Sequence, residues 1–254
     1  MEVDFERRFG GVARLYGIEA LERFRKAHVC VIGIGGVGSW AVEALARSAI
    51  GRLTLIDLDH VAESNTNRQI HALGEEFGKA KTSAMAERIS AINPYCSVEE
   101  VEDFVTEDNL DALLGRGYDY VIDAIDQTRV KAALIAWCKR HDVKLITTGS
   151  AGGQVDPSRI KVDDLSRTIQ DPLASRMRSL LRKNYGFPRD VKKKFGVECV
   201  YSDEPLKYPD AGQACEVDQG GVTGLNCAGF GSSVCVTASF GFVAASRVLM
   251  HLAK

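Results

Sequence analysis

Short apolar runs alternate with longer, helix-like segments from the N-terminus to Gly149. The short runs are mostly continuous, as expected of parallel strands that are buried on both faces. They occupy residues 28–32, 52–56, 97–101, 120–124 and 143–148. The segments that indicate helices are 5–26, 39–49, 79–92, 108–114 and 130–141. This alternation predicts an α/β fold of the Rossmann-like, doubly wound type, with a mostly parallel sheet.

The pattern changes after Gly149 and predicts a C-terminal extension within a single domain, 1–254. Residues 160–162 look like an edge strand, and the Gly-, Pro- and Asp-rich residues 199–221 look like a long loop. Residues 222–246 carry no charge and are long enough to cross a bilayer. Because small and polar residues dilute their hydrophobicity, we expect a buried helix, packed on the sheet or on a second subunit, rather than a membrane helix.

The composition indicates a globular protein and does not by itself indicate a function. The chain has 254 residues, 45% of them hydrophobic, and a net charge of −2, which is ordinary for a globular protein. Its seven cysteines include no C-x-x-C pair, which argues against a disulfide framework and against structural zinc. The charged N-terminus does not resemble a signal peptide, so we expect a cytoplasmic location.

A glycine-rich turn follows the first apolar run. Gly33, Gly35, Gly36 and Gly38 stand between a predicted strand and a predicted helix, in the pattern G-x-G-G-x-G. Glycines there let the backbone approach a phosphate closely, and the helix N-terminus supplies free N–H groups. Asp57, nineteen residues after Gly38, ends the next strand, where a carboxylate can accept hydrogen bonds from ribose hydroxyls. The sequence therefore predicts a nucleotide site, without choosing between NAD and ATP.

Polar residues at later strand ends favour phosphate chemistry. Asp59, Asn65, Arg68 and Gln69 crowd the loop after Asp57, and Lys81 begins a helix. Asp126 follows another predicted parallel strand. Because the carboxyl ends of such strands meet at one crevice, Arg68, Lys81 and Asp126 could converge on the nucleotide. Two cations and a carboxylate able to hold Mg²⁺ suit phosphate transfer better than hydride transfer. Taken singly, each residue has a simpler explanation as a surface ion-pair partner, a solvated lysine or a helix cap.

These motifs resemble a known family. G-x-G-G-x-G, D-x-D, S-N-x-x-R-Q, G-K-x-K and D-x-x-D, in this order over residues 5–149, are similar to the ubiquitin-activating-enzyme-like adenylyltransferases. The resemblance implies that Asp57 holds the ribose of ATP, that Asp126 holds Mg²⁺, and that Arg68 and Lys81 hold the triphosphate, with Arg68, Lys81 and Asp126 as the catalytic set. The ATP-binding set that it implies is Gly33, Gly35, Gly36, Gly38, Asp57, Asp59, Asn65, Arg68, Gln69 and Lys81.

The chain departs from parts of this family's pattern. The paired C-x-x-C motifs that hold zinc in many relatives are absent, so no zinc is expected. A catalytic cysteine in a crossover loop is common in the family, and Cys215 is the candidate here, with a free thiol as the simpler alternative. The resemblance also implies a homodimer and a link to a cysteine desulfurase or sulfur-acceptor system. In relatives an N-terminal arginine reaches the neighbouring subunit's ATP, a place that Arg8 or Arg14 could fill.

Charge is distributed unevenly along the chain. Residues 158–194 contain eleven Arg or Lys and four Asp, a net charge of +7, so the remainder carries −9. Such a segment indicates a polyanionic partner such as tRNA, although a solvated basic helix face would look the same. The residues predicted to contact tRNA are Arg176, Arg178, Arg182, Lys183, Lys192 and Lys193.

With R-F-G-G-V-A-R-L-Y-G near its start and F-G-F-V-A-A-S near its end, the whole chain resembles the tRNA-modifying branch of the superfamily. In that branch a carboxylate on a modified adenosine is adenylated by ATP, and an internal group then closes a ring and expels AMP. The alternative is adenylation of the C-terminus of a ubiquitin-like sulfur carrier. A regulatory nucleotide-binding module and an NAD-dependent oxidoreductase are further, weaker alternatives.

Overall fold

The computed structural model describes residues 4–208 and 230–254. Within them the strands form one seven-stranded sheet of order β3-β2-β1-β4-β5-β7-β6. All neighbouring strands pair in parallel except β6, which lies at the edge and runs antiparallel to β7. The strands are β1 His28–Ile32, β2 Arg52–Ile56, β3 Ser97–Val101, β4 Tyr120–Asp123, β5 Leu145–Thr148, β6 Ile160–Asp164 and β7 Glu198–Ser202. The predicted mostly parallel sheet is confirmed.

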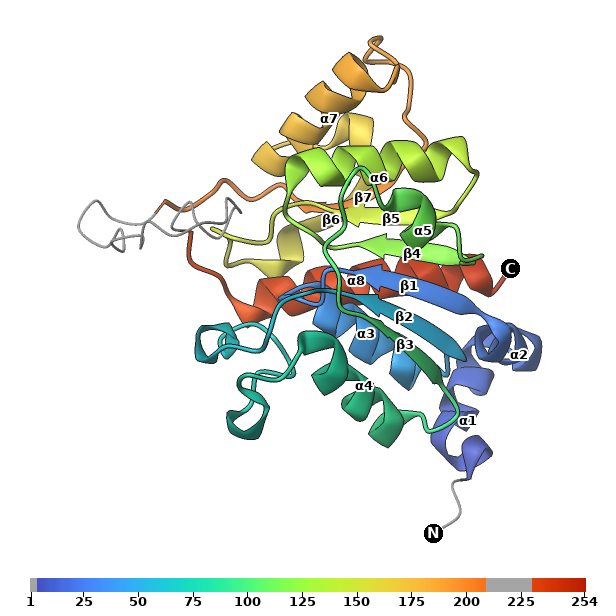
Figure 1. Ribbon diagram of the computed structural model, residues 1–254. Helices are drawn as coiled ribbons and strands as arrows, with labels where there is room; N and C mark the ends of the chain where they lie inside the picture. The colour runs from blue at the N-terminus through green and yellow to red at the C-terminus, as the bar shows by residue number, and fades with distance from the viewer. Residues whose placement is uncertain (1–3, 209–229) are drawn as a thin grey trace.

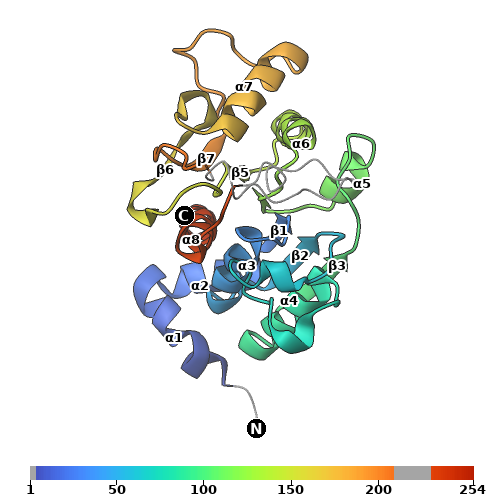
Figure 2. The ribbon, with the colours of Figure 1, turned by 90° about the vertical axis from the view of Figure 1, so that its left-hand side faces the viewer.

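Helices cover both faces of this sheet (Figures 1 and 2). Helices α2, α3, α4 and α8 lie on one face, and α5, α6 and α7 lie on the other. The described helices are α1 Phe5–Tyr16, α2 Ile18–Lys26, α3 Gly38–Arg47, α4 Lys81–Ile92, α5 Leu110–Leu114, α6 Thr128–Arg140, α7 Pro172–Asn184 and α8 Val234–Leu252. Single 3₁₀ turns occupy Glu63–Asn65, Gly74–Glu76, Pro157–Arg159 and Leu165–Arg167. The fold is therefore doubly wound.

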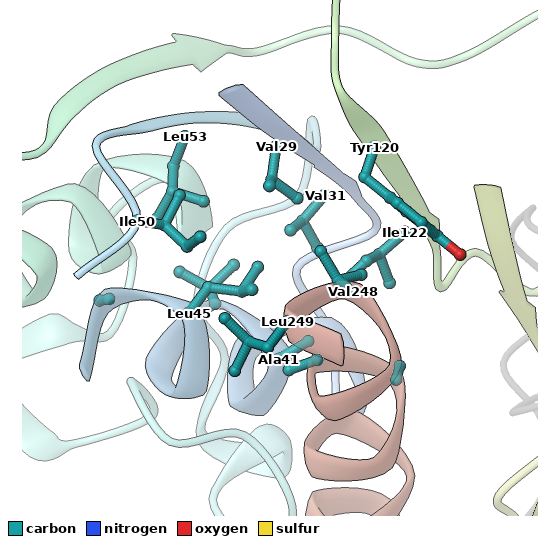
Figure 3. Packing of buried hydrophobic residues seen from close by; sticks show 14 of the residues in the cluster. Val29, Val31, Ala41, Leu45, Ile50, Leu53, Tyr120, Ile122, Val248 and Leu249 are labelled. Atoms are coloured by element: carbon teal, nitrogen blue, oxygen red, sulfur yellow. The ribbon is translucent and has the colours of Figure 1, made fainter. Parts of the chain in front are cut away.

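Strand β1 shows why its apolar run is continuous. Val29 and Val31 contribute to one core, whereas Cys30 and Ile32 contribute to the core on the opposite face. Successive side chains of a strand point to opposite faces, so the run 29–32, which is covered on both sides, is apolar throughout. Figure 3 shows the first core, where residues of the strands meet α3 and α8. Its labelled members are Val29, Val31, Ala41, Leu45, Ile50, Leu53, Tyr120, Ile122, Val248 and Leu249.

The uncharged C-terminal segment forms α8. In the described residues this helix is the one long and apolar enough to cross a membrane. Val236, Phe240 and Val248 are buried, and the helix packs against α3 and the sheet. Packing inside the fold thus accounts for its composition, and the predicted buried helix is confirmed over residues 234–246. Residues 222–229 of the predicted segment lie outside the described residues.

One prediction for the C-terminal half is wrong. Residues 199–221 look like a loop in the sequence, but Glu198–Ser202 form β7, which lies between β5 and the edge strand β6. Ile146 pairs with Glu198 in the parallel register of β5 and β7. The strand is only five residues long and runs directly into Gly-, Pro- and Asp-rich sequence, so composition hides it. Residues 209–221 of that predicted loop lie outside the described part of the chain.

Candidate active site

A cavity of about 290 Å³ lies at the carboxyl ends of β1, β2, β4 and β5. Ligands of doubly wound sheets bind at this edge, where the strand order reverses direction on either side of β1. Most residues that the sequence singled out line the cavity, and they come from segments far apart in the chain. Those present are Gly33, Gly35, Gly36, Asp57, Asp59, Asn65, Arg68, Gln69, Lys81 and Asp126.

The glycine turn forms the floor of this cavity. Gly33 has a φ of 86°, a conformation that a residue with a side chain rarely adopts. Gly38 does not line the cavity, because it lies beneath the turn as the first residue of α3. A Cβ atom at Gly38 would lie 1.8 Å from the carbonyl oxygen of Gly33, so only glycine fits. Gly38 therefore shapes the turn, whereas Gly33, Gly35 and Gly36 face the ligand space.

Asp57 stands at the end of β2 and is fixed by two backbone hydrogen bonds. Its Oδ2 accepts from Ile34 N at 2.6 Å, and its Oδ1 accepts from Asp59 N at 2.8 Å. Burial raises the pKa of this carboxyl, although Lys81 and the two N–H donors oppose the shift. Each oxygen keeps acceptor capacity toward the cavity, which is what a pair of ribose hydroxyls requires.

Lys81 begins α4, and its side chain is only 7% exposed. Its Nζ lies 2.7 Å from Asp59 Oδ2, and its backbone N–H donates to the carbonyl of Asp59. The positive end of the α4 dipole lies at the same place and adds to the positive potential. Lys81 is therefore a buried cation at the cavity wall, unlike the solvated helix lysine that its position in the sequence also allows.

The loop after β2 is built around Asn65 and Arg68. Asn65 Oδ1 accepts from Ala62 N at 3.1 Å and so closes a 3₁₀ turn. Arg68 Nη1 donates to Ser64 O at 2.8 Å and to Asn67 Oδ1 at 2.9 Å, and burial lowers the pKa of its guanidinium. Because Arg68 has no carboxylate within ion-pair distance in the described residues, its charge stays available to an anionic ligand.

The two aspartates of D-x-x-D have different environments. Asp123 is fully buried, 2.9 Å from Lys131 Nζ, and accepts from the Thr147 hydroxyl at 2.7 Å. Burial raises its pKa, and the Lys131 charge opposes that shift. Asp126 lines the cavity, half-buried, and has neither a hydrogen-bond nor an ion-pair partner among residues 4–208 and 230–254. Of the two, Asp126 is therefore the one whose carboxylate is open to a metal ion.

Several residues of the cavity wall escaped the sequence analysis. Residues 103–105 follow β3, Thr148 ends β5, and residues 149–152 follow it. Gln69 was singled out, but its Oε1 proves to be buried without a partner among the described residues. The missed residues have ordinary side chains and belong to no motif. Their position after parallel strands was the one signal in the sequence that could have indicated them.

The basic segment is less uniform than its sequence suggests. Arg159 is 2.8 Å from Asp203, which also pairs with Lys161. Arg178 donates to the Thr168 hydroxyl. Arg182 donates to Pro188 O and lies over the Phe195 ring, 5.1 Å from its centroid. Of the predicted tRNA contacts, Arg178 and Arg182 are thus half-buried, whereas those on open surface are Arg176, Lys183, Lys192 and Lys193.

A sequence model of the ThiF family matches residues 9–245, nearly the whole chain. The chain belongs to the ThiF family. This agrees with the resemblance carried by the glycine turn and the S-N-x-x-R-Q loop. The match extends past the nucleotide site and includes α7, β7 and most of α8.

Relatives within this ThiF family match the chain from end to end. The Haemophilus influenzae protein named tRNA threonylcarbamoyladenosine dehydratase is 52% identical over 99% of this chain and 95% of its own length. The crystal structure of the Escherichia coli tRNA N6-threonylcarbamoyladenosine dehydratase with ATP is 52% identical, covers 99% of this chain and 97% of its own, and has a TM-score of 0.89. The same enzyme with AMP has a TM-score of 0.88 at 54% identity, covering 98% and 95% of the two chains.

Two further expectations concern the edges of the ThiF-family site. Arg8 donates to the carbonyls of Ala91 and Ile92, the last turn of α4, at 3.0 and 2.7 Å. It is therefore engaged at the carboxyl end of α4, and α1, which carries it, lies at the end of the sheet where the strands begin (Figure 1), away from the cavity at their carboxyl ends. Arg14, also in α1, is exposed, so it is the freer of the two arginines. Cys215 lies outside the described residues.

Proposed function

We propose that this ThiF-family chain is an ATP-dependent tRNA threonylcarbamoyladenosine dehydratase. The observation that carries the proposal is the match, over nearly the full length of both chains, to relatives that bear this name. The cavity adds a chemical argument, because its free cation Arg68, buried Lys81 and unpaired Asp126 are the groups that a reaction at phosphate requires.

In the proposed reaction a carboxylate oxygen of the threonyl group attacks the α-phosphorus of ATP, and pyrophosphate leaves. The carboxyl carbon becomes electrophilic, because AMP is a good leaving group. The carbamoyl group of the same side chain then attacks this carbon and closes the ring. AMP departs with the oxygen that formerly belonged to the carboxylate, so one ATP drives the loss of one water. Since the attacking group belongs to the substrate, no protein nucleophile is needed.

This chain's residues bind and orient ATP for that attack. Gly33 N donates to Ile56 O and Ile34 N donates to Asp57, so the N–H groups left for the phosphates in this turn are those of Gly35 and Gly36, at the start of α3. Asp57, whose carboxylate is oriented by Ile34 and Asp59, accepts from the ribose hydroxyls. Arg68 and Lys81 neutralise the charge that develops on the pyrophosphate. Lys81 exchanges its partner Asp59 for a phosphate oxygen as ATP enters.

We also propose Mg²⁺ as part of this site. The half-buried Asp126 carboxylate fits the role, because it lines the cavity without a partner in the described part of the chain. Mg²⁺ usually takes one or two carboxylates and completes its shell with phosphate oxygens and water. When bound, the ion supplies Lewis-acid stabilisation of phosphate charge. Asp123 is excluded from this role by its buried pair with Lys131.

The proposal extends to the state of the protein in the cell. We propose a cytoplasmic location. The family resemblance of the sequence implies a homodimer and a cysteine desulfurase or sulfur-acceptor partner. The exposed apolar side chains of Leu15 and Ile18, 77% and 75% exposed, lie beside Arg14 and offer a surface for a second subunit. Sedimentation velocity at micromolar concentration tests the dimer directly.

ATP–pyrophosphate exchange tests the proposed function. The purified chain should exchange pyrophosphate into ATP when threonylcarbamoylated tRNA is added, and it should convert that tRNA to a product lighter by one water. A ubiquitin-like sulfur carrier is the comparison substrate. Exchange with the carrier and none with the tRNA would replace the proposal by the sulfur-carrier alternative, and no exchange with either would exclude adenylation.

A further inference from the structure

A second hollow lies beside the ATP cavity and is separate from it. It has a volume of about 470 Å³, within the range of small-ligand pockets. Its walls come from the start of α7 and from the chain that follows β7. The residues lining it are Gln170, Asp171, Pro172, Ser175, Arg178, Pro205, Leu206 and Tyr208.

The two hollows share a thin wall. Asp171 lines the second hollow, and its Oδ2 accepts from the backbone N–H of Ser150, which lines the ATP cavity, at 2.9 Å. Tyr208 of the hollow and Phe230 of the cavity pack together, with ring centroids 5.1 Å apart. A ligand lodged in the hollow therefore needs to extend a side chain over only one residue layer to reach the ATP cavity.

An exposed aromatic ring stands at the mouth of the hollow. Tyr208 is 73% exposed, although Phe230 supports it from one side. Exposure of a large ring on a rigid support is costly in water but suits stacking with a nucleobase. Unpaired bases of single-stranded RNA are commonly held in this way, whereas bases within a duplex are not accessible.

A cation without a carboxylate partner lines the same hollow. Arg178 is half-buried and donates to the Thr168 hydroxyl. No carboxylate lies within ion-pair distance of it in the part of the chain that the structure describes. Asp171 lines the same hollow but is not within ion-pair distance of Arg178, and its two oxygens accept from Ala174 N and Ser150 N. Burial of the guanidinium and the nearby charge of Arg182 lower its pKa, and the negative charge of Asp171 opposes this shift without cancelling it.

We infer that this hollow receives the modified adenosine of the tRNA, with its base stacked on Tyr208 and a neighbouring phosphate on Arg178. The threonylcarbamoyl side chain then extends across the Asp171–Ser150 wall into the ATP cavity. The inference rests on the proposed function and adds to it the place of the nucleotide. It also separates two kinds of basic residue: Arg178 acts at the reacting nucleotide, and the exposed lysines act on the tRNA backbone farther away.

Steady-state kinetics of variants test this placement. Tyr208→Ala should raise KM for threonylcarbamoylated tRNA by about tenfold or more, the usual effect of losing one stacked base. The Kd for ATP should stay within twofold of wild type. Tyr208→Phe should restore the wild-type KM, because stacking requires the ring and not the hydroxyl. Tyr95→Ala removes a 53% exposed tyrosine near the amino end of β3 and serves as the matched control.

Two further measurements make the test specific. Threonylcarbamoyladenosine 5′-monophosphate should inhibit wild type competitively against tRNA and should lose this effect in Tyr208→Ala. Arg178→Gln should raise KM for tRNA and should also weaken inhibition by the nucleotide. If Arg178 instead contacted the tRNA backbone far from the modified adenosine, inhibition by the nucleotide would not change. Wild-type turnover with an unchanged KM in both Tyr208→Ala and Arg178→Gln would overturn the inference while leaving the proposed function intact. Absence of wild-type turnover would remove the proposed function and this inference together.

Discussion

At the scale of single residues, the same amino acid takes opposite roles a few positions apart. Asp123 is enclosed with Lys131 and Thr147, where its charge is compensated by fixed partners. Asp126, three residues later, has left the strand and faces the cavity. Lys79 and Lys81 differ in the same way, since Lys79 pairs with surface glutamates and Lys81 is buried at the cavity wall. Burial and partners, not residue type, decide which group is available to a ligand.

The three charged groups of the cavity should be individually essential. Arg68→Ala, Lys81→Ala and Asp126→Ala should each lower ATP–pyrophosphate exchange by roughly a hundredfold or more, because each removes a preorganised charge near the reacting phosphates. The three variants should fold, as judged by thermal unfolding. Lys79→Ala, a lysine two residues from Lys81 but outside the cavity, is the control and should retain full exchange. Near-normal exchange in any two of the three variants would show that these residues are not the catalytic set.

His71 should make stability depend on pH. It is 2% exposed, neither ring nitrogen has a partner in the described residues, and burial with nearby Lys81 and Arg88 lowers its pKa to about 4. The unfolded chain, with a histidine pKa near 6.5, binds the proton first. Between pH 6.5 and 4 the free energy of unfolding therefore falls as pH falls, by about 2–3 kcal/mol for this group at pH 4.5.

Comparison with a variant separates the contribution of His71 to this pH dependence from the contributions of the buried carboxyls. Burial raises the pKa values of Asp57, Asp123 and Asp171, so their contributions have the opposite sign. Urea unfolding of His71→Leu should show less loss of stability than wild type between pH 7 and pH 4.5. His60→Leu, which removes an exposed histidine, is the control. Parallel pH profiles for wild type and His71→Leu would contradict the prediction.

At the scale of elements, α7 is connected to the cavity by its own N-cap. Asp171 Oδ1 accepts from Ala174 N, which caps the helix, while Oδ2 accepts from Ser150 N in the loop after β5. One buried carboxylate thus joins a helix of the C-terminal extension to the wall of the nucleotide site. The extension was recognisable in the sequence by its charge, but its attachment depends on this contact between residues 21 positions apart.

Loss of the Asp171 cap should lower the stability of the fold. Asp171→Ala leaves the N–H groups of Ala174 and Ser150 without their acceptor, and it should lower the free energy of unfolding by about 1–3 kcal/mol. Urea unfolding measures this change. Asp156→Ala removes an equivalent cap from the exposed turn Pro157–Arg159 and should cost less, because water replaces the lost acceptor. Equal effects of the two substitutions would show that the buried contact to Ser150 adds nothing.

At the scale of the whole molecule, the positive charge is concentrated on one side of the sheet. The chain carries −2 overall, whereas residues 158–194 carry +7. Helix α7 and the chain after it project beyond α6, at the top of Figure 1. Cations gathered at such a projection favour a large polyanion, since several phosphates can be neutralised without approaching the acidic remainder of the chain.

Exposed members of this basic segment should contribute affinity for tRNA without affecting ATP. Lys183→Glu, Lys192→Glu and Lys193→Glu combined should weaken tRNA binding and flatten its dependence on salt, because fewer counter-ions are released. The Kd for ATP should not change. Filter binding between low and moderate salt measures both effects, with Lys254→Glu, in the terminal turn after α8, as the charge control. Unchanged tRNA binding in the triple variant would show that the basic segment is a solvated surface that does not bind tRNA.

Much of the fold could be predicted from the pattern of residues alone. The continuous apolar runs of β1, β2 and β4 are specific to strands covered on both faces, and the glycine turn with Asp57 and the Asn65–Gln69 loop locates a nucleotide site. Local sequence suffices there, because strand burial, a φ of 86° at Gly33 and the close approach at Gly38 each impose a residue type on a single position.

Only the tertiary structure decided the rest, because it depends on partners distant in sequence. β7 is a strand through its pairing with β5 and β6, although its flanks look like loop. Asp123 and Asp126 are equivalent in the motif and become distinct only when Lys131 reaches one of them. Arg178 and Arg182 look like free surface cations until Thr168, Pro188 and Phe195 are placed against them. The sequence gives the charge of a side chain. The tertiary structure determines whether that charge is solvated by water, paired with a protein group or available to a ligand.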